Sequence, residues 1–527
     1  MPTTPEPEAT DAAHRAQSSY DQSSYDQSSY ARPAGWAAPG AALVSSAAAE
    51  SIPSADELGR VHLIGIAGAG MSAVARIMLA RGVPVSGCEN KESAGVRALR
   101  EAGADISIGH SLDHLDAADT VVYSTAISPT HFELAAARER GLRVLRRASA
   151  LGAMITGSRS VAIAGTHGKT TTTSLLTVAA QAAGLDPSFA IGANLRASGT
   201  NGQVGTGDVF IVEADESDGS FLLLRPDVAI VLNVEADHLE NHGDLAGVFR
   251  AFEQFVDRIA PGGLLVTCAD DAGARRLADY ARDQGVRVLT YGTAADADVR
   301  LTGILEHRDS VEITVTGLAG FPQPVSVRVG SMIGHHMALN ATGALALAVE
   351  IGADAQDFGP LAAAWSDFAG VSRRFEFRGE VEGVRVYDDY AHHPTEVRAE
   401  LTAARATLPQ AGPGRLVAVF QPGTYSRTQT FAKEFGEALA VADVAVVLDI
   451  FASREEPLPG VTGGLIAEFV PLPAADVVYE PDRDAVAARV AELVRAGDVV
   501  VTMGIGDVYL LCPDILAEIA HRSMSDD

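Results

Sequence analysis

From residue 60 onward, short apolar runs alternate with segments of helical pattern, and this alternation restricts the possible folds more than any other feature of the chain. The runs VHLIGIA (61–67) and SVAIAG (160–165) have the length of buried strands, and a helical segment follows each of them. Apolar strands that alternate with helices form parallel sheets covered by helices. The sequence therefore predicts an α/β protein built from successive units of this kind.

Three such units fit a length of 527 residues. We expect a Rossmann-like N-terminal domain at 51–158, a central domain with a mostly parallel sheet at 159–369 and a Rossmann-like C-terminal domain at 370–527. Helices are expected at 71–82 and 172–184, and further strands at 120–127, 208–215, 228–238, 415–421, 444–450 and 498–504.

Residues 1–50 have a different composition from the rest of the chain. They are rich in Ser, Ala, Pro and Gln, and they contain the five-residue repeat SSYDQSSYDQSSY. Such a segment buries too little apolar surface to offset the entropy of ordering it. We expect a disordered low-complexity tail.

The charge and the cysteines exclude several classes of protein. A net charge of −28 argues against nucleic acid or an anionic membrane as the main partner. The chain has no run of about 18 apolar residues that could span a membrane, and its N-terminus lacks the features of a signal peptide. Three widely spaced cysteines without a CxxC pair predict neither disulfides nor a zinc site, and they fit a reducing compartment. We expect a cytoplasmic protein that is a monomer or a homodimer.

The first glycine-rich loop follows the first predicted strand. The stretch GIAGAGMSA (65–73) places Gly68, Gly70 and Ala73 in a G-x-G-x-x-A pattern. Its glycines let the backbone approach a diphosphate, and the helix N-terminus supplies N–H donors and a positive dipole. An acid, Glu89, follows about 20 residues later, as in dinucleotide sites. On these features a nicotinamide dinucleotide and a nucleoside-diphosphate sugar fit equally well.

The second glycine-rich loop predicts a nucleotide phosphate site. It reads GTHGKTT (165–171) and is shorter than the standard phosphate loop, since Ile163 stands where the first glycine is expected. Its backbone N–H groups can surround phosphates, Lys169 can reach the outer phosphates, and the Thr170 hydroxyl can bind Mg²⁺. Only three of the 40 basic residues are lysines, so a lysine in this loop indicates a specific role for the ammonium group.

Acidic groups and a histidine follow the next two predicted strands. The stretch VEADESD (212–218) contains Glu213, and EADHLE (235–240) contains His238. Both stretches stand at strand ends on the side of the sheet where the phosphate loop lies. Phosphoryl transfer needs metal ligands, so Thr170, Glu213 and His238 are candidate ligands of magnesium.

These motifs together resemble the Mur ligases, ATP-dependent amide-bond-forming enzymes of peptidoglycan precursor synthesis. The resemblance runs in order from about residue 60 to residue 510 and begins with the phosphate loop, the EADESD stretch and the Asp-His pair at 237–238. Further motifs narrow it to the branch that joins L-alanine to UDP-N-acetylmuramate: FAGVSRRFEFRG (368–379), DDYAHHPTE (388–396), FQPGTYSRT (420–428) and GIGDV (504–508).

The resemblance implies a site residue by residue. The sugar nucleotide would lie against Gly68, Ala69, Gly70, Met71, Glu89, Ser124 and Ala126. The phosphates of ATP would lie against Gly165, Thr166, His167, Gly168, Lys169, Thr170 and Thr171. Two magnesium ions would be held with the help of Thr170, Glu213 and His238. Adenosine would meet Asn340 and Asp389, and the γ-phosphate would meet Arg373. The reacting carboxylate and the incoming alanine would meet His392, Tyr425 and Arg427. The implied catalytic residues are Lys169, Glu213, His238, Arg373, His392 and Arg427.

The implied reaction activates the lactyl carboxylate of UDP-N-acetylmuramate as an acyl phosphate, which the amine of alanine then attacks. ADP and phosphate are the other products. Three domains must converge to build such a site, and closure is expected to exclude water from the acyl phosphate.

The chain departs from the family pattern at three places. Met337 stands where the family often has Asn, and Gly423 and Thr424 stand where His and Arg are common. Several Mur ligases also have a carbamylated lysine shortly after the Asp-His pair. Here no lysine follows that pair until Lys433, and a guanidinium cannot replace it because it stays protonated.

Three alternatives to the alanine-adding activity stay open on the sequence. A branch of the same family attaches a preformed tripeptide to the same sugar nucleotide, although RRFE and DDYAHHPTE favour the alanine branch. A nicotinamide-dependent oxidoreductase would explain residues 60–90 but not the phosphate loop. A non-catalytic scaffold with a binding tail would not need Lys169, Glu213 and His238.

Overall fold

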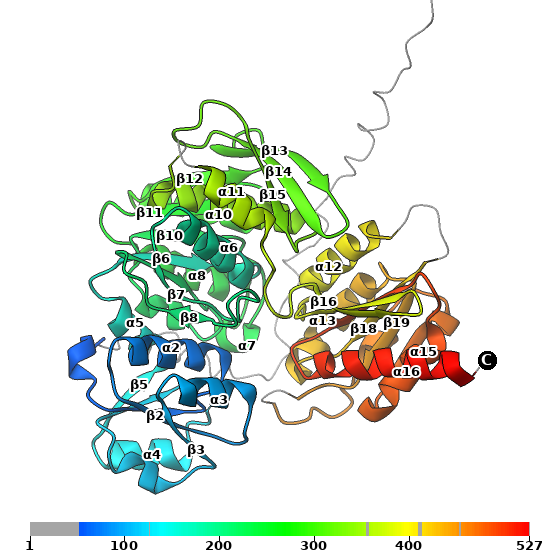
Figure 1. The fold of residues 1–527 in the computed structure, drawn as a ribbon, viewed down its shortest axis with the longest axis horizontal. Helices are drawn as coiled ribbons and strands as arrows, with labels where there is room; N and C mark the ends of the chain where they lie inside the picture. The colour runs from blue at the N-terminus through cyan, green and yellow to red at the C-terminus, as the bar shows by residue number, and fades with distance from the viewer. Residues whose placement is uncertain (1–51, 126, 355–357, 409–413, 453–454, 526–527) are drawn as a thin grey trace, which may run out of the picture.

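The structure is a computed structural model that describes residues 52–125, 127–354, 358–408, 414–452 and 455–525. The predicted tail at 1–50 and Ala126 lie outside the described residues. Figure 1 shows three α/β parts, with the N-terminal part (blue) below the central part (green) and the C-terminal part (yellow to red) beside them. The predicted three-part α/β architecture is confirmed, and the exact domain boundaries stay a prediction.

The N-terminal part contains a five-stranded parallel sheet in the order β3-β2-β1-β4-β5, which is the strand order of a Rossmann fold. Its elements are η3 (Ala55–Glu57), β1 (Val61–Ile64), α2 (Ala69–Ala80), β2 (Val85–Glu89), α3 (Ala94–Glu101), β3 (Asp105–Ile108), η4 (Leu112–Leu115), β4 (Thr120–Tyr123), α4 (Phe132–Glu139), β5 (Arg143–Arg146) and α5 (Arg147–Ile155).

The central part contains a ten-stranded sheet in the order β15-β14-β13-β12-β11-β10-β6-β9-β7-β8. It is parallel from β13 to β7, and the outer strands β14, β15 and β8 pair antiparallel. Its strands are β6 (Arg159–Ala164), β7 (Ser188–Ala190), β8 (Gly202–Gln203), β9 (Val209–Glu213), β10 (Val228–Val231), β11 (Leu264–Cys268), β12 (Arg287–Gly292), β13 (Val299–Glu306), β14 (Ser310–Thr316) and β15 (Val325–Gly330). Its helices are α6 (Lys169–Ala182), η5 (Ser220–Leu223), α7 (Leu239–His242), α8 (Leu245–Val256), α9 (Ala272–Asp283), α10 (His335–Ile351) and α11 (Phe358–Ser366).

The C-terminal part contains a six-stranded sheet in the order β16-β17-β21-β18-β19-β20, parallel except for β16. Its strands are β16 (Glu376–Val381), β17 (Val384–Asp389), β18 (Leu416–Phe420), β19 (Val444–Leu448), β20 (Val477–Glu480) and β21 (Val499–Met503). Its helices are α12 (Pro394–Ala406), α13 (Tyr425–Leu439), α14 (Gly464–Ala467), η7 (Ala474–Asp476), η8 (Arg483–Ala485), α15 (Val486–Leu493), η9 (Val508–Leu510) and α16 (Leu511–Ser525).

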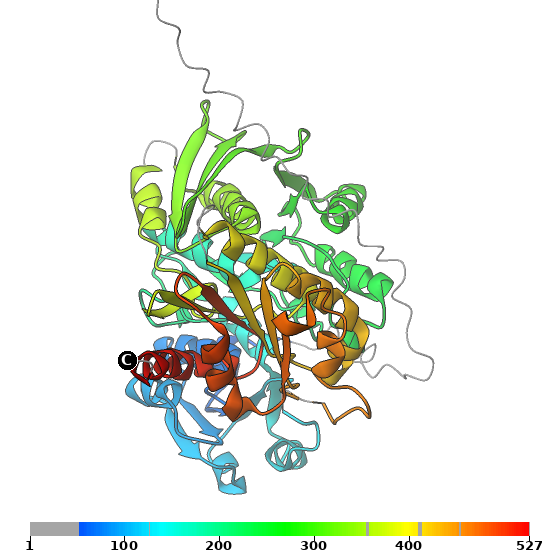
Figure 2. The ribbon, with the colours of Figure 1, turned by 90° about the vertical axis from the view of Figure 1, so that its right-hand side faces the viewer.

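The three parts are joined in two different ways. A continuous apolar core runs from the N-terminal part into the central part and includes Met71, Leu151, Phe221 and Phe255. The C-terminal part has separate cores on the two faces of its sheet, and Leu239 of α7 packs against one of them. In Figure 2, turned by 90°, the C-terminal part faces the viewer in front of the other two. Among the described residues, no helix has both the length and the apolar character needed to cross a membrane.

Some predicted strands were too long. The strand predicted at 228–238 ends at Val231, and the one predicted at 120–127 ends at Tyr123. Beyond β10 the chain leaves the sheet because Asn233 binds the phosphate loop. The Asn233 side chain accepts a hydrogen bond from the backbone N–H of His167 (2.7 Å) and donates one to the His167 carbonyl (3.2 Å). The residues after β10 therefore serve the site rather than the sheet.

Candidate active site

The phosphate loop connects β6 to α6 at the carboxyl edge of the central sheet. Gly168 has a φ of +84°, and a Cβ at this position would lie 2.6 Å from Oδ1 of Asn340 in α10. Only glycine satisfies both the left-handed backbone and this close approach. The first turn of α6 follows at once, so its free N–H groups are available to an anion.

Lys169 is held at this loop by a buried carboxylate. Its Nζ donates to the carbonyls of Gly165 (2.7 Å) and Thr166 (3.0 Å), and it lies 2.7 and 3.0 Å from the two carboxylate oxygens of Glu216. Burial lowers the pKa of Lys169, but Glu216 and Asp215 outweigh that effect and raise it. Lys169 is therefore charged and paired with a carboxylate at the place where phosphates would bind.

Two of the three expected metal ligands lie together. The Thr170 hydroxyl donates to Oε1 of Glu213 at 3.0 Å, and the backbone N–H of Gly192 donates to Oε2 of Glu213 at 2.8 Å. A hydroxyl beside a carboxylate oxygen is a donor set that suits Mg²⁺. These two residues therefore fit the ion.

His238, the third expected ligand, does not contact the other two in the described structure. Its Nδ1 lies 3.3 Å from Oε1 of Glu240 and its Nε2 lies 3.6 Å from Oδ2 of Asp237. Burial opposes the charge of this imidazole, but Asp237 and Glu240 raise the pKa of His238 to about 9. His238 must lose a proton before it can bind a metal. Its backbone is in the left-handed region (φ +50°), a strain that is common at functional positions.

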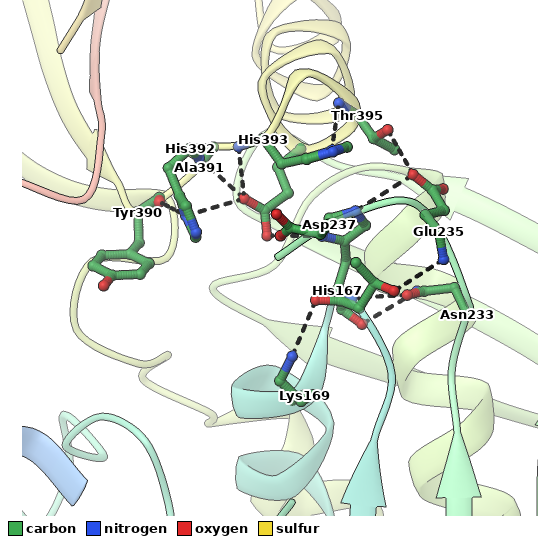
Figure 3. Close-up of polar contacts among 12 residues, drawn as sticks. His167, Lys169, Asn233, Glu235, Asp237, Tyr390, Ala391, His392, His393 and Thr395 are labelled. Atoms are coloured by element: carbon green, nitrogen blue, oxygen red, sulfur yellow. Dashed lines mark hydrogen bonds and ion pairs between the residues drawn. The ribbon is translucent and has the colours of Figure 1, made fainter. Parts of the chain in front are cut away.

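Ionised groups connect the central and C-terminal parts beside this loop (Figure 3). Nδ1 of His167 lies 3.2 Å from Oε1 of Glu396 in α12, and its Nε2 lies 3.5 Å from Glu235, close enough for an ion pair but without hydrogen-bond geometry. Burial lowers the pKa of His167, but the two carboxylates raise it to about 10. The Thr395 hydroxyl donates to Oε2 of Glu235 at 2.8 Å. The phosphate loop is therefore bound to α12 by a charged imidazole.

Two further residues of the C-terminal part bind the stretch that follows β10. Arg427, in the first turn of α13, forms an ion pair with Asp237, and Nε2 of His393 lies 3.3 Å from the carbonyl oxygen of Ala236. His392 faces its own part instead, with Nδ1 2.9 Å from the Tyr390 carbonyl oxygen. Burial lowers the pKa of His392 to about 4, so this imidazole is neutral near pH 7.

A cleft of ≈ 1430 Å³ opens between the central and C-terminal parts. Its walls include five of the expected nucleotide ligands, which are His167, Gly168, Thr171, Asn340 and Asp389. The Asp389 carboxylate is buried and accepts from the backbone N–H groups of Ala391 (2.6 Å) and Phe375 (2.8 Å). The volume and the lining fit a nucleotide.

Arg374, rather than Arg373, lines this cleft. The guanidinium of Arg373 lies 3.0 Å from Oδ2 of Asp388 and donates to the carbonyls of Gly504 (2.6 Å) and Gly506 (3.3 Å) inside the C-terminal part. Burial lowers the pKa of Arg374, but Asp389, Glu396 and Glu213 raise it. The assignment of the γ-phosphate to Arg373 stays a prediction, and Arg374 is a second candidate, which the sequence did not single out.

The first glycine-rich loop faces the central part. Gly68 precedes α2, and Ala69, Gly70 and Met71 form its first turn. A Cβ on Gly70 would lie 1.8 Å from Nη1 of Arg147, so the guanidinium packs directly on this glycine.

Residues near this loop connect it to the acidic stretch after β9. Arg147 lies 3.2 Å from Asp215, and the Thr125 hydroxyl donates to Asp218 at 2.8 Å. The sequence did not indicate Arg147 and Thr125, because each lies in the N-terminal part and contacts an acidic residue of the central part. Glu89 accepts from the backbone N–H of Ala67 at 3.1 Å and thereby holds the loop. Ser124 follows β4 directly and lies beside Thr125.

The structure gives reasons for the departures from the family pattern. A Cβ at Gly423 would lie 2.2 Å from Cγ2 of Ile505, so Ile505 fills the space that a larger residue would need. The Thr424 hydroxyl caps α13 by accepting from the backbone N–H of Arg427 (3.3 Å), and Tyr425 begins that helix. Met337 lines the cleft next to Asn340.

No lysine stands near the metal ligands apart from Lys169. The other two lysines of the chain, Lys91 and Lys433, are exposed, and Lys433 lies 3.7 Å from Glu437 on α13. A carbamylated lysine is therefore not available to this site.

Comparisons with known proteins agree with this geometry. Three family models match: "Mur ligase family, catalytic domain" at residues 60–159, "Mur ligase middle domain" at 163–348 and "Mur ligase, glutamate ligase domain" at 373–506. The UDP-N-acetylmuramate–L-alanine ligase of Saccharopolyspora erythraea is 54% identical over 472 residues, which cover 88% of this chain and 94% of that protein.

Solved structures agree as well. The UDP-N-acetylmuramate–alanine ligase of Thermotoga maritima superposes with a TM-score of 0.71 at 26% identity, covering 89% of this chain and 100% of that one. A murein peptide ligase from Psychrobacter arcticus follows, with a TM-score of 0.65 at 25% identity, covering 88% of this chain and 99% of that one.

Proposed function

The chain belongs to the Mur ligase family, and from this premise we infer that it joins L-alanine to the lactyl carboxylate of UDP-N-acetylmuramate at the expense of ATP. The reaction is a peptide-adding step of peptidoglycan precursor synthesis and yields ADP and phosphate. The observation that carries it is the identity of 54% over 88% of the chain to an enzyme of this activity. A nicotinamide-dependent oxidoreductase and a non-catalytic scaffold are not supported by these matches.

ATP would lie in the cleft between the central and C-terminal parts. The fit rests on Gly168, whose missing side chain leaves room beside Asn340, and on the free N–H groups at the start of α6. Asn340 and Asp389 would meet the adenosine, and Lys169 and Arg374 would neutralise charge on the transferred phosphoryl group. Arg373 would support Arg374 from behind through its contacts with Asp388, Gly504 and Gly506.

Magnesium would be held by Thr170 and Glu213, with His238 joining once it has lost its proton. The ions would offset the negative charge that gathers between the phosphates of ATP and the substrate carboxylate. Two ions are part of the proposal, and without a carbamylated lysine the second would depend on His238, the substrates and water.

The chemistry proceeds in two steps whose bonds balance. A lactyl carboxylate oxygen forms a bond to the γ-phosphorus while the bond between that phosphorus and the β–γ bridging oxygen breaks, and ADP leaves. The alanine amine then forms a C–N bond to the activated carbonyl, and the C–O bond to phosphate breaks. The amine gives up a proton, which passes to solvent or to the leaving phosphate. His392 would meet the reacting groups as a neutral imidazole, because its lowered pKa makes it a weak base.

The sugar nucleotide would bind at the first glycine-rich loop, with its diphosphate at Gly68–Met71 and Arg147 nearby. Arg147 is paired with Asp215 at 3.2 Å and packs on Gly70, so this cation sits between the first glycine-rich loop and the acidic stretch after β9. Two further residues belong to the same proposed subsite. Ser124 would lie near the sugar, and Glu89 would fix the loop by accepting the hydrogen bond from the backbone N–H of Ala67.

One assay tests the proposal against the tripeptide-adding alternative. Phosphate release is measured with ATP, magnesium and UDP-N-acetylmuramate in the presence of L-alanine, glycine, L-serine or the tripeptide in turn. We expect the fastest release with L-alanine and none above background with the tripeptide. Release with the tripeptide alone would show that the alternative is correct.

A further inference from the structure

A cluster of ligand-type side chains lies in the N-terminal part, away from the ATP cleft. It consists of His62 on β1, Cys88 on β2, His114 in η4 and Glu133 in α4, and one ligand atom from each lies within 4.8 Å of the others. Nothing in the proposed ligation uses these residues.

The sheet explains how the four residues meet. β1 and β2 are neighbouring parallel strands in which His62 pairs with Ser86 and Ile64 with Cys88. Side chains alternate between the two faces of a strand, so His62 and Cys88 point to the same face, the one covered by α4 and η4. Those two helices bring Glu133 and His114 onto that face.

The four side chains are enclosed and in contact. Cys88 and Glu133 are fully buried and His62 is 1% exposed. Oε1 of Glu133 lies 2.9 Å from Nδ1 of His114, and its Oε2 lies 3.4 Å from Sγ of Cys88. Nδ1 of His110 lies 2.8 Å from Oε2 of Glu133 and 3.2 Å from Sγ of Cys88, so this histidine contacts two of the four side chains.

One atom of this cluster has no partner. Nδ1 of His62 lies 3.0 Å from the Ser86 hydroxyl, whereas its buried Nε2 has no hydrogen-bond partner among the residues that the structure describes. The rings of His62 and His114 lie side by side, with centroids 5.6 Å apart. A buried polar atom without a partner is costly and needs an explanation. A lone pair beside a thiol, an imidazole and a carboxylate is what a metal ligand offers.

We propose that His62, Cys88, His114 and Glu133 bind one Zn²⁺ ion in a closed tetrahedral site. Nitrogen, sulfur and carboxylate donors suit Zn²⁺, whereas Mg²⁺ prefers six oxygens, so this site differs from the one for ATP. Four protein ligands leave no open position, which makes the site structural. Binding forms a Zn–S bond, and the proton of the Cys88 thiol passes to solvent. The sequence predicts no zinc site because its three cysteines are widely spaced. The proposed site escapes such a pattern because three of its four ligands are not cysteines.

The site is connected to the first glycine-rich loop by one strand. The Cys88 carbonyl accepts from the backbone N–H groups of Gly65 (3.0 Å) and Ile66 (3.2 Å), and the next residue, Glu89, holds Ala67. An ion on Cys88 would fix the end of β2 and with it the loop at which the sugar diphosphate is proposed to bind.

The test measures zinc directly, with no dependence on ligation. The purified full-length chain is stripped with a chelator, and Zn²⁺ is titrated back by calorimetry in competition with a chromophoric chelator. We expect one tight site per chain, a rise in melting temperature with Zn²⁺, and an affinity lowered on the order of 100-fold in Cys88→Ser and in His62→Gln. Cys512→Ser, which removes a buried thiol of the C-terminal part, is the matched control and should bind as the wild type does.

Cobalt substitution identifies the ligands even if a variant folds poorly. Co²⁺ in the stripped wild-type chain should give the intense visible bands of a tetrahedral ion and a thiolate-to-cobalt charge-transfer band, which Cys512→Ser retains. Absence of binding in the wild type would overturn the proposal. A second result would also overturn the proposal. If binding survives Cys88→Ser, shows no charge-transfer band and is lost in Glu235→Gln, the ion is held by His167, Glu235 and His393 instead.

Discussion

Replacing Lys169 by alanine should cost both stability and catalysis, and the structure allows the two losses to be separated. The Nζ atom of Lys169 lies 2.7 and 3.0 Å from the carboxylate oxygens of Glu216, whose exposure is only 3%. Lys169→Ala therefore removes the partner of a buried carboxylate and also removes the cation expected to meet the phosphates.

The loss of stability can be bounded from this geometry. Leaving one member of a buried ion pair without its partner costs about 3–5 kcal/mol. Burial already raises the pKa of Glu216 although Lys169 lowers it, so without Lys169 this carboxyl takes up a proton more readily. Protonation limits the cost to the lower end, about 3 kcal/mol. For a domain of roughly 150–250 residues this corresponds to a fall in melting temperature of about 6–12 °C.

Four proteins are compared by calorimetric melting and by phosphate release: wild type, Lys169→Ala, Glu216→Gln and the double variant. The double variant has neither Lys169 nor the charge of Glu216, so no member of the pair is left unpaired. Its melting temperature should therefore be close to that of the wild type, although it should not catalyse ligation. UDP-N-acetylmuramate should bind to all four with similar affinity in titration calorimetry, since its proposed site lies in another part of the chain. A double variant that is as unstable as Lys169→Ala, or that regains turnover, would refute the reasoning.

Four further outcomes follow from the same site. The carboxylates around His167 raise its pKa to about 10 from an ordinary 6.5, so the stabilisation they give is complete below pH 6.5 and is lost as pH rises to about 10. His167→Gln should therefore flatten the fall of melting temperature between these two pH values. An unchanged slope would count against the contact of His167 with Glu235 and Glu396. Glu213→Ala and His238→Ala should each raise the magnesium concentration needed for half-maximal rate several-fold, and normal metal dependence would remove them from the metal site. Removing CO₂ and bicarbonate should leave the rate unchanged, since no lysine is available for carbamylation, and a loss restored by bicarbonate would contradict this. Deletion of residues 1–50 should leave turnover within about twofold of the full chain, and a large loss of rate or stability would show that the tail contributes to the folded protein.

The parts of the site that stand at the ends of neighbouring parallel strands could be predicted from the sequence. Thr170 and Glu213 meet because β6 and β9 are neighbours in a parallel sheet, and their carboxyl ends share an edge. The type of each residue and its distance from a strand end were therefore enough to predict that the two side chains lie together. The glycine-rich loops could be placed for the same reason, since each directly follows a strand.

Contacts between units could not be predicted in this way. Arg373 and Arg374 are adjacent and chemically equal, and the choice between them depends on the left-handed backbone of Arg373 (φ +61°), which turns its side chain to Asp388. The zinc cluster likewise combines residues from two strands and two helices, at positions 62 to 133, with no spacing that marks them in the sequence. The positions of such residues depend on how the elements pack, and a local sequence pattern gives no information about that packing.

Three of the cations that face the proposed ligands share one property that bears on how an acidic chain can hold anionic substrates. Lys169 is paired with Glu216, Arg427 with Asp237, and Arg147 with Asp215. Each carboxylate orients its cation and limits the cost of burying it until a ligand arrives. A phosphate or a substrate carboxylate must then exchange with that carboxylate, and the displaced carboxylates add to the negative charge around the phosphates. That charge would repel free ATP and would repel ATP that carries magnesium less strongly, because the ion offsets part of its negative charge. A need for magnesium is therefore expected from the paired cations as well as from the proposed metal ligands.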